Sequence, residues 1–126
     1  MARPIYLGQI TETSTARLTT TVEDFDGTAI GSANITTATW SLLLKSDGST
    51  INSRSGVDMS GDISAAGLLT LVLTTVDNAL QSTADSMPET RILSLHVVAT
   101  GADALAVTKN EEFEYDVVQL EAVSSA

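Results

Sequence analysis

The chain contains one histidine, His96, with a serine, Ser94, two residues before it on the same face of an expected strand. In a hydrolase triad the histidine must reach both a nucleophile and an orienting carboxylate by hydrogen bonds. Ser94 does not belong to a Gly-x-Ser-x-Gly turn, which would expose it as a nucleophile. We therefore expect His96 to be a structural or surface residue, and we expect no catalytic residues and no enzyme activity.

Carboxylates occur in close pairs that could act as a general acid and base. The pairs are Asp24 with Asp26, Glu111 with Glu112, and Glu114 with Asp116. General acid–base catalysis needs two carboxyl groups with separated pKa values in a cleft. These pairs lie in turns or alternate with apolar residues along expected strands, so the favoured interpretation is a solvated face.

The segment Asp24-Phe25-Asp26-Gly27 resembles the start of a calcium-binding loop, in which side-chain oxygens alternate along the chain. The bidentate glutamate of such a loop is missing, so the segment is better explained as a turn with Gly27 at positive φ. The alternative is a weak calcium site completed by Asp58 or Asp62. Phosphate-binding glycine loops and His-Glu-x-x-His motifs do not occur, so we expect no cofactor and no metal.

Composition narrows the class of protein further. The 126 residues correspond to one domain, and 43% hydrophobic content is enough for a core. Cysteine is absent, so the fold does not depend on disulfides. A formal net charge of -10 disfavours binding to nucleic acid or to an anionic membrane surface. We find neither a signal peptide nor a membrane span, and we expect synthesis in a host cytoplasm.

Apolar residues recur at every second position in several segments that turn residues separate, as in half-buried strands. The expected strands are residues 7–13, 16–25, 39–45, 50–54, 67–75, 91–100 and 106–120, the last as one strand or two. Residues 29–35 are an edge strand or a loop. Asp47-Gly48 predicts a hairpin turn, and residues 77–80 predict one helical turn capped by Thr75 or Asp77.

About seven short strands without a long amphipathic helix predict an all-β protein, an immunoglobulin-like antiparallel β-sandwich. Residues 91–100 are expected to be a central strand, and Trp40 to lie between the sheets. A small barrel or jelly roll is the alternative. We expect one domain over residues 1–126, with a short arm at 1–6 and a tail at 122–126.

The order of turns and strands resembles small immunoglobulin-like virion proteins of tailed bacteriophages, over residues 5 to 122. The resemblance is carried by residues 47–54, 67–73, 77–78, 89–91, Gly101 and 109–120. A looser similarity, in strand-and-turn rhythm only, is to the N-terminal domain of phage baseplate upper proteins. The resemblance implies a non-enzymatic part of a virion that docks on a symmetric shell or tube.

Three functions follow from this resemblance as expectations. The first is a decoration or cement protein on the capsid exterior, bound to the major capsid protein. The second is a neck, tail or baseplate component bound to neck or tail proteins, and a homo-oligomer on a symmetric assembly fits both. The third is a receptor- or glycan-binding module. Sugar sites favour exposed aromatic residues, whereas Trp40 and Tyr115 are expected in the core, which leaves Tyr6.

Two segments are the expected interface. The arm at residues 2–6 contains an extended Arg-Pro pair that could lie on a neighbour, and the loop at residues 55–66 is polar and surface-exposed. The interface residues selected from them are Arg3, Pro4, Ile5, Tyr6, Val57, Asp58 and Met59.

Overall fold

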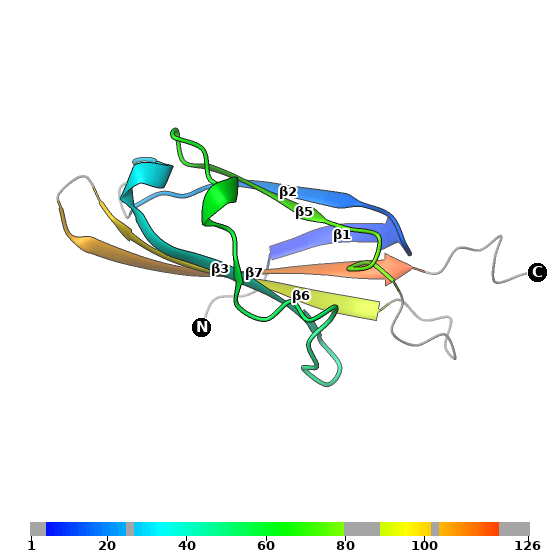
Figure 1. The fold of residues 1–126 in the computed structure, drawn as a ribbon. Helices are drawn as coiled ribbons and strands as arrows, with labels where there is room; N and C mark the ends of the chain where they lie inside the picture. Colours follow the sequence, from blue (N-terminus) through cyan, green and yellow to red (C-terminus); the bar gives the residue numbers. More distant parts are fainter. Residues whose placement is uncertain (1–4, 25–26, 80–88, 102–103, 119–126) are drawn as a thin grey trace, which may run out of the picture.

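The computed structural model describes residues 5–24, 27–79, 89–101 and 104–118, and these form seven strands in two packed layers (Figure 1). The strands are β1 (Ile5–Thr11), β2 (Ala16–Thr21), β3 (Ile35–Leu44), β4 (Val57–Asp58), β5 (Leu68–Leu73), β6 (Glu89–Thr100) and β7 (Ala106–Val118). Two short 3-10 turns, Ser32–Asn34 and Ser60–Asp62, precede β3 and follow β4. None of the described residues belongs to a helix long and apolar enough to cross a membrane. The all-β prediction is confirmed.

The larger sheet contains five strands in the order β1-β7-β6-β3-β4, so β6 is central, as predicted. In β7, Phe113, Tyr115 and Val117 are buried while the residues between them are not, which is the alternation expected for one buried face. Ala106 to Val118 is one continuous strand that pairs with β6 over its whole length.

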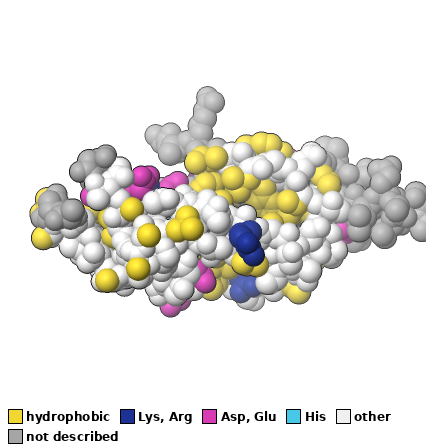
Figure 2. Space-filling view, turned by 90° about the horizontal axis from the view of Figure 1, so that it is seen from above, with side chains coloured by type: hydrophobic (Ala, Val, Ile, Leu, Met, Phe, Trp, Pro, Cys, Tyr) yellow, Lys and Arg dark blue, Asp and Glu magenta, His cyan; other side chains and the backbone are white. Residues whose placement is uncertain are grey.

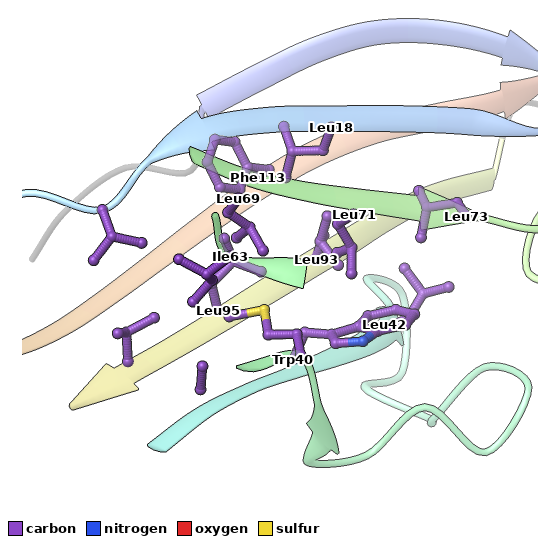
Figure 3. Close-up of a cluster of buried hydrophobic side chains, with 14 of the residues drawn as sticks. Leu18, Trp40, Leu42, Ile63, Leu69, Leu71, Leu73, Leu93, Leu95 and Phe113 are labelled. Carbon is purple, nitrogen blue, oxygen red and sulfur yellow. The ribbon is translucent and has the colours of Figure 1, made fainter. Parts of the chain in front are cut away.

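The smaller sheet consists of β2 and β5, paired antiparallel from Ala16–Leu73 to Thr21–Leu68. Its buried face packs against the larger sheet, and Figure 3 shows Leu18 of β2 among the core side chains together with Phe113 of β7. Trp40 is 4% exposed and lies in this core, as predicted. The core therefore lies between the two sheets. Its principal side chains are Leu18, Trp40, Leu42, Ile63, Leu69, Leu71, Leu73, Leu93, Leu95 and Phe113.

The strand order β7-β6-β3-β4 against β2-β5 is the G-F-C-C′ and B-E arrangement of an immunoglobulin-like sandwich. One pair departs from the antiparallel prediction, because β1 runs parallel to β7 with a register shift between Tyr6 and Gly8. Parallel neighbours need a long connection, and here almost the whole chain lies between them. Since β1 joins the larger sheet, β2 is left at one edge of the smaller sheet.

Two local predictions were wrong, the strand at residues 50–54 and the cap of the turn after β5. Residues 50–54 do not form a strand: Thr50 makes one isolated bridge to Leu43, and Asn52 and Ser53 adopt positive φ values of 52° and 56°. Of the two alternatives for residues 29–35, the loop is found: it contains one bridge, at Ala29, and a 3-10 turn before β3 begins at Ile35. The turn after β5 is capped by Thr74, whose side chain and backbone exchange hydrogen bonds with Asp77. The turn at Asp47-Gly48 is confirmed, since Gly48 N–H donates to Leu44 O, but the chain returns from it with one isolated bridge and no strand.

Candidate functional site

His96 is exposed on the outer face of β6, opposite Asn110 of β7. Its Nδ1 lies 2.5 Å from Asn110 Oδ1, which is an amide oxygen and not an orienting carboxylate. Ser94 is half-buried on the same face, opposite Glu112. The described hydrogen bonds of His96 do not include one to Ser94. His96 therefore occupies a surface position, in agreement with the sequence-based interpretation.

Asp24 is a turn residue. Its Oδ1 accepts the Thr28 N–H at 3.1 Å, its backbone bonds to Thr28 O and Gly27 N–H, and Gly27 has φ +88°. Asp26 lies outside the described residues. Asp58, the suggested distant ligand, accepts the Ser60 N–H at 3.0 Å, and this bond lowers the pKa of Asp58 below its ordinary value. Within the described ranges, no three acidic or histidine residues are grouped as metal ligands.

Asp77 accepts several side-chain and backbone hydrogen bonds, whereas the sequence predicted it only as a cap. Its side chain is fully buried and accepts hydrogen bonds from Arg54, Asn52 and Thr74. Arg54 also lies over Trp40, with its guanidinium carbon 5.1 Å from the ring centroid. Burial alone would raise the pKa of Asp77, but these hydrogen bonds outweigh it and hold the pKa below its ordinary value.

Arg91 completes this buried polar cluster from β6. Its guanidinium donates to Asp77 O at 2.6 Å, Ala79 O at 2.7 Å and Glu89 Oε1 at 2.8 Å. Asn78 is also fully buried: its amide donates to Ser14 O and its Oδ1 accepts from Tyr115. Burial raises the pKa of Tyr115 to about 12.

These contacts assign the buried polar cluster a structural role. Together they fasten the turn after β5 to the β1–β2 connection, to the loop after β3 and to β6. The oxygens of Asp77 are saturated with donors from the protein, and its side chain has no exposed surface. An accessible reactive group needs an unoccupied face toward a substrate, which Asp77 does not have.

The more open feature is the side of the sandwich formed by β1 and β2, which we call the open side. A cavity of about 130 Å³ lies there between the sheets. Its lining is mostly apolar and comes from four strands: Leu7, Gly8, Ile10, Ala16, Arg17, Leu18, Leu73 and Tyr115. Leu7 is 46% exposed at this cavity, so β1 is only partly covered by the smaller sheet.

Exposed hydrophobic side chains occur on β1 and on the outer face of β5. Five of the seven large ones among the described residues are there, Ile5, Tyr6, Leu7, Leu68 and Val72, and Leu7 also lines the cavity. Figure 2, which looks down on the β2–β5 face, shows one larger patch of hydrophobic side chains and several smaller separate groups. The strands β1 and β2 contain no acidic residue and one basic residue, Arg17, in a chain of net charge -10. Exposed apolar patches are typical of protein-binding sites.

The predicted interface residues lie at opposite edges of the five-stranded sheet. Ile5 and Tyr6 are exposed on β1, and the Tyr6 hydroxyl donates to Asp116 Oδ2 at 2.9 Å. Val57 and Asp58 form β4 at the other edge, where Val57 is half-buried and Asp58 exposed. Met59 is 1% exposed and packs in the core, so its selection as an interface residue was wrong. Arg3 and Pro4 lie outside the described residues.

The sequence-based selection missed the cavity and the edge of β2. The absence of acidic residues from 5–11 and 16–21 was visible in the sequence. The pairing that places these two segments on one side of the sandwich was not. The chain matches no protein family, no curated protein and no solved structure.

Proposed function

We propose that this chain is a non-enzymatic structural protein that binds another protein through its open side. The observation that carries the proposal is the combination, on one side, of two strand edges without acidic residues and a mostly apolar cavity of about 130 Å³. Strand edges of this kind bind other chains through backbone hydrogen bonds. The exposed Leu7 adds apolar area that a partner would bury.

The charge distribution supports the same proposal. A net charge of -10 keeps copies of the chain apart in solution and away from nucleic acid. On the open side, β1 and β2 themselves have no carboxylates, and two carboxylates of β7 beside them are paired: Asp116 accepts from Tyr6 and Thr90, and Glu111 lies 3.5 Å from Lys109. A partner protein can therefore approach there without burying an unpaired acidic group.

We propose that the protein is part of a bacteriophage virion and binds the capsid exterior as a decoration or cement protein. This assignment is supported by the resemblance described above. A neck, tail or baseplate component is the second candidate from the same resemblance. A chain that binds at many equivalent positions gains strength from multivalency even when each contact is weak.

Quantitative mass spectrometry of purified particles from the source that encodes the chain tests this proposal. A decoration protein is expected at a copy number comparable to that of the major capsid protein. A neck or tail protein is expected at the copy number of a single ring. Absence of the chain from purified particles would contradict both assignments.

A further inference from the structure

We infer that the free edge of β2 takes up one extended segment of a partner protein, which adds a third strand to the two-stranded sheet. This inference rests on the proposed function and specifies how the open side binds. The expected occupant is a single strand with apolar inward side chains and basic outward side chains.

The backbone of β2 offers hydrogen-bonding groups on its free side. Val22 N–H donates to Gly67 O at 2.8 Å, which fixes the side of the strand that faces β5. Successive residues of an antiparallel strand direct their backbone groups to opposite sides. The N–H and C=O groups of Arg17, Thr19 and Thr21 therefore point away from β5. Among the described residues, β5 is the sole strand paired with β2.

The cavity provides the side-chain part of the site. A strand added to β2 would place alternate side chains toward the larger sheet, in line with Ala16 and Leu18. These two residues line the cavity together with Leu7 and Ile10 of β1. Cavities of about 150 Å³ hold an apolar group of the size of benzene. The volume of about 130 Å³ found here suits one aliphatic side chain of the incoming strand.

The shape of the open side favours a single strand over a second copy of this protein. β1 is the end strand of the larger sheet, and its exposed Leu7 shows that it reaches beyond the cover of β2. A second copy that paired through its own β2 would bring its own larger sheet into the layer that β1 occupies. An isolated extended segment has no such second layer and fits above β1.

The net charge of the whole chain, and not an acidic cluster on β2, favours basic outward side chains in the partner segment, since Arg17 is the one charged residue of β2. The chain has 16 acidic and six basic residues, so its field attracts a basic segment. Next to Ala16 and Leu18 the inward positions meet the mostly apolar cavity, where an unpaired charge would be costly to bury. Next to Thr20 and Thr21 they meet a pocket that Lys109 and Glu111 of β7 also line, so a basic residue of the partner can approach Glu111 there. The partner segment therefore alternates apolar residues with lysine or arginine.

A capped peptide of about eight residues, alternating valine and lysine, is the probe for this site, since it spans β2. Hydrogen exchange followed by NMR should show that the amides of Arg17, Thr19 and Thr21 gain protection when the peptide binds. A peptide of the same length with a central proline should not bind, because proline cannot complete the ladder. Protection of β1 amides instead, or no saturable effect up to about 1 mM peptide, would overturn the inference.

Thr19→Pro provides the matched variant, because it removes an outward N–H and leaves the pairing with β5 intact. It should weaken peptide binding by about tenfold or more, while Thr19→Ala binds as the wild type does. If Thr19→Pro does not fold, the hydrogen-exchange pattern of the wild type with the peptide still shows whether the peptide pairs with β2. Incorporation of a folded Thr19→Pro protein into particles at the wild-type copy number would overturn strand addition and leave the proposed function standing. Absence of the wild type from particles would instead overturn the proposed function.

Discussion

Arg54 donates two hydrogen bonds to the buried carboxylate of Asp77, with Nε 2.8 Å from Oδ1 and Nη2 3.2 Å from Oδ2. Asp77 lies in the turn after β5 and Arg54 in the loop between β3 and β4, so the pair ties an end of the smaller sheet to the larger one. Bidentate arginine–carboxylate contacts are the strong class of charged hydrogen bonds. The integrity of the sandwich at this end depends on that contact.

Replacing Arg54 by alanine should therefore destabilise the protein severely. The change leaves Asp77 charged and fully buried, and breaking a buried pair costs about 3–5 kcal/mol. We expect the lower end, about 3 kcal/mol, because the Arg54 side chain is 27% exposed. Urea unfolding measures the loss, with Lys45→Ala as the control.

Lys45 also pairs with a carboxylate at 2.9 Å, but its side chain is 55% exposed. Its removal should cost no more than about 1 kcal/mol. Equal losses for Arg54→Ala and Lys45→Ala would contradict the importance given to burial of Asp77.

The same cluster predicts how stability depends on acid. Burial opposes ionisation of Asp77, but its hydrogen bonds prevail and lower its pKa in the folded state. In the unfolded chain the pKa of Asp77 is about 3.9. As the pH falls below this value, the unfolded chain takes up the proton before the folded chain does. The contribution of Asp77 is thus complete above that pH and is lost as the pH falls through the folded pKa.

Unfolding free energies at a series of pH values from neutral to acid check this dependence. Asp77→Asn should show a smaller loss on acidification than the wild type, because its side chain cannot be protonated. The exposed Asp47 and Asp58, whose pKa values are also lowered by hydrogen bonds to Ser49 and Ser60, remain in both proteins and cancel in the comparison. Identical acid dependence of the two proteins would show that Asp77 is not held ionised.

Tyr115 should titrate far above an ordinary tyrosine. Burial raises its pKa to about 12, and the neutral hydroxyl donates to Asn78 Oδ1 at 3.0 Å. The contribution of Tyr115 to stability is fully present below its pKa in the unfolded chain, which is near 10. It is lost as the pH rises through the pKa of the folded state. In Tyr6→Phe, which leaves Tyr115 as the single tyrosine, phenolate absorbance should rise near pH 12. A rise near pH 10 in the folded protein would contradict this placement.

Gly31 and Gly61 provide a test of close backbone approach. A Cβ at Gly31 would lie 2.1 Å from Ala65 O, whereas a Cβ at Gly61 would meet nothing within 4 Å. Gly31→Ala must displace the backbone at residue 65, and we expect a loss of about 1–3 kcal/mol. Gly61→Ala should be neutral or stabilise by up to about 1 kcal/mol. Thermal unfolding of the two variants compares them directly, and equal midpoints would refute the close approach.

The sequence was a good guide to strands whose side chains alternate. The buried sets in β3, β5 and β7 follow from local pattern alone, because a period of two assigns each residue to a face. The parallel pairing of β1 with β7 could not be predicted in this way, since it depends on which sheet a strand joins.

In the buried polar cluster, too, contacts between residues close in sequence could be predicted, whereas contacts between distant residues could not. The spacing of Thr74 and Asp77 is that of a helix cap and could have been recognised. The partners of Asp77 and Asn78 come from Asn52, Arg54, Arg91 and Tyr115, on other elements. No sequence spacing connects them, because tertiary packing alone brings these residues together.

The most direct test of binding through the open side is a photo-cross-linking amino acid placed at Leu7, with Asp58 at the opposite sheet edge as the control position. Each variant is incorporated into particles, irradiated and analysed by mass spectrometry. Our account predicts a cross-link from position 7 to an extended segment of another virion protein and none from position 58. A cross-link from position 58 alone, with position 7 left unreacted in assembled particles, would contradict it.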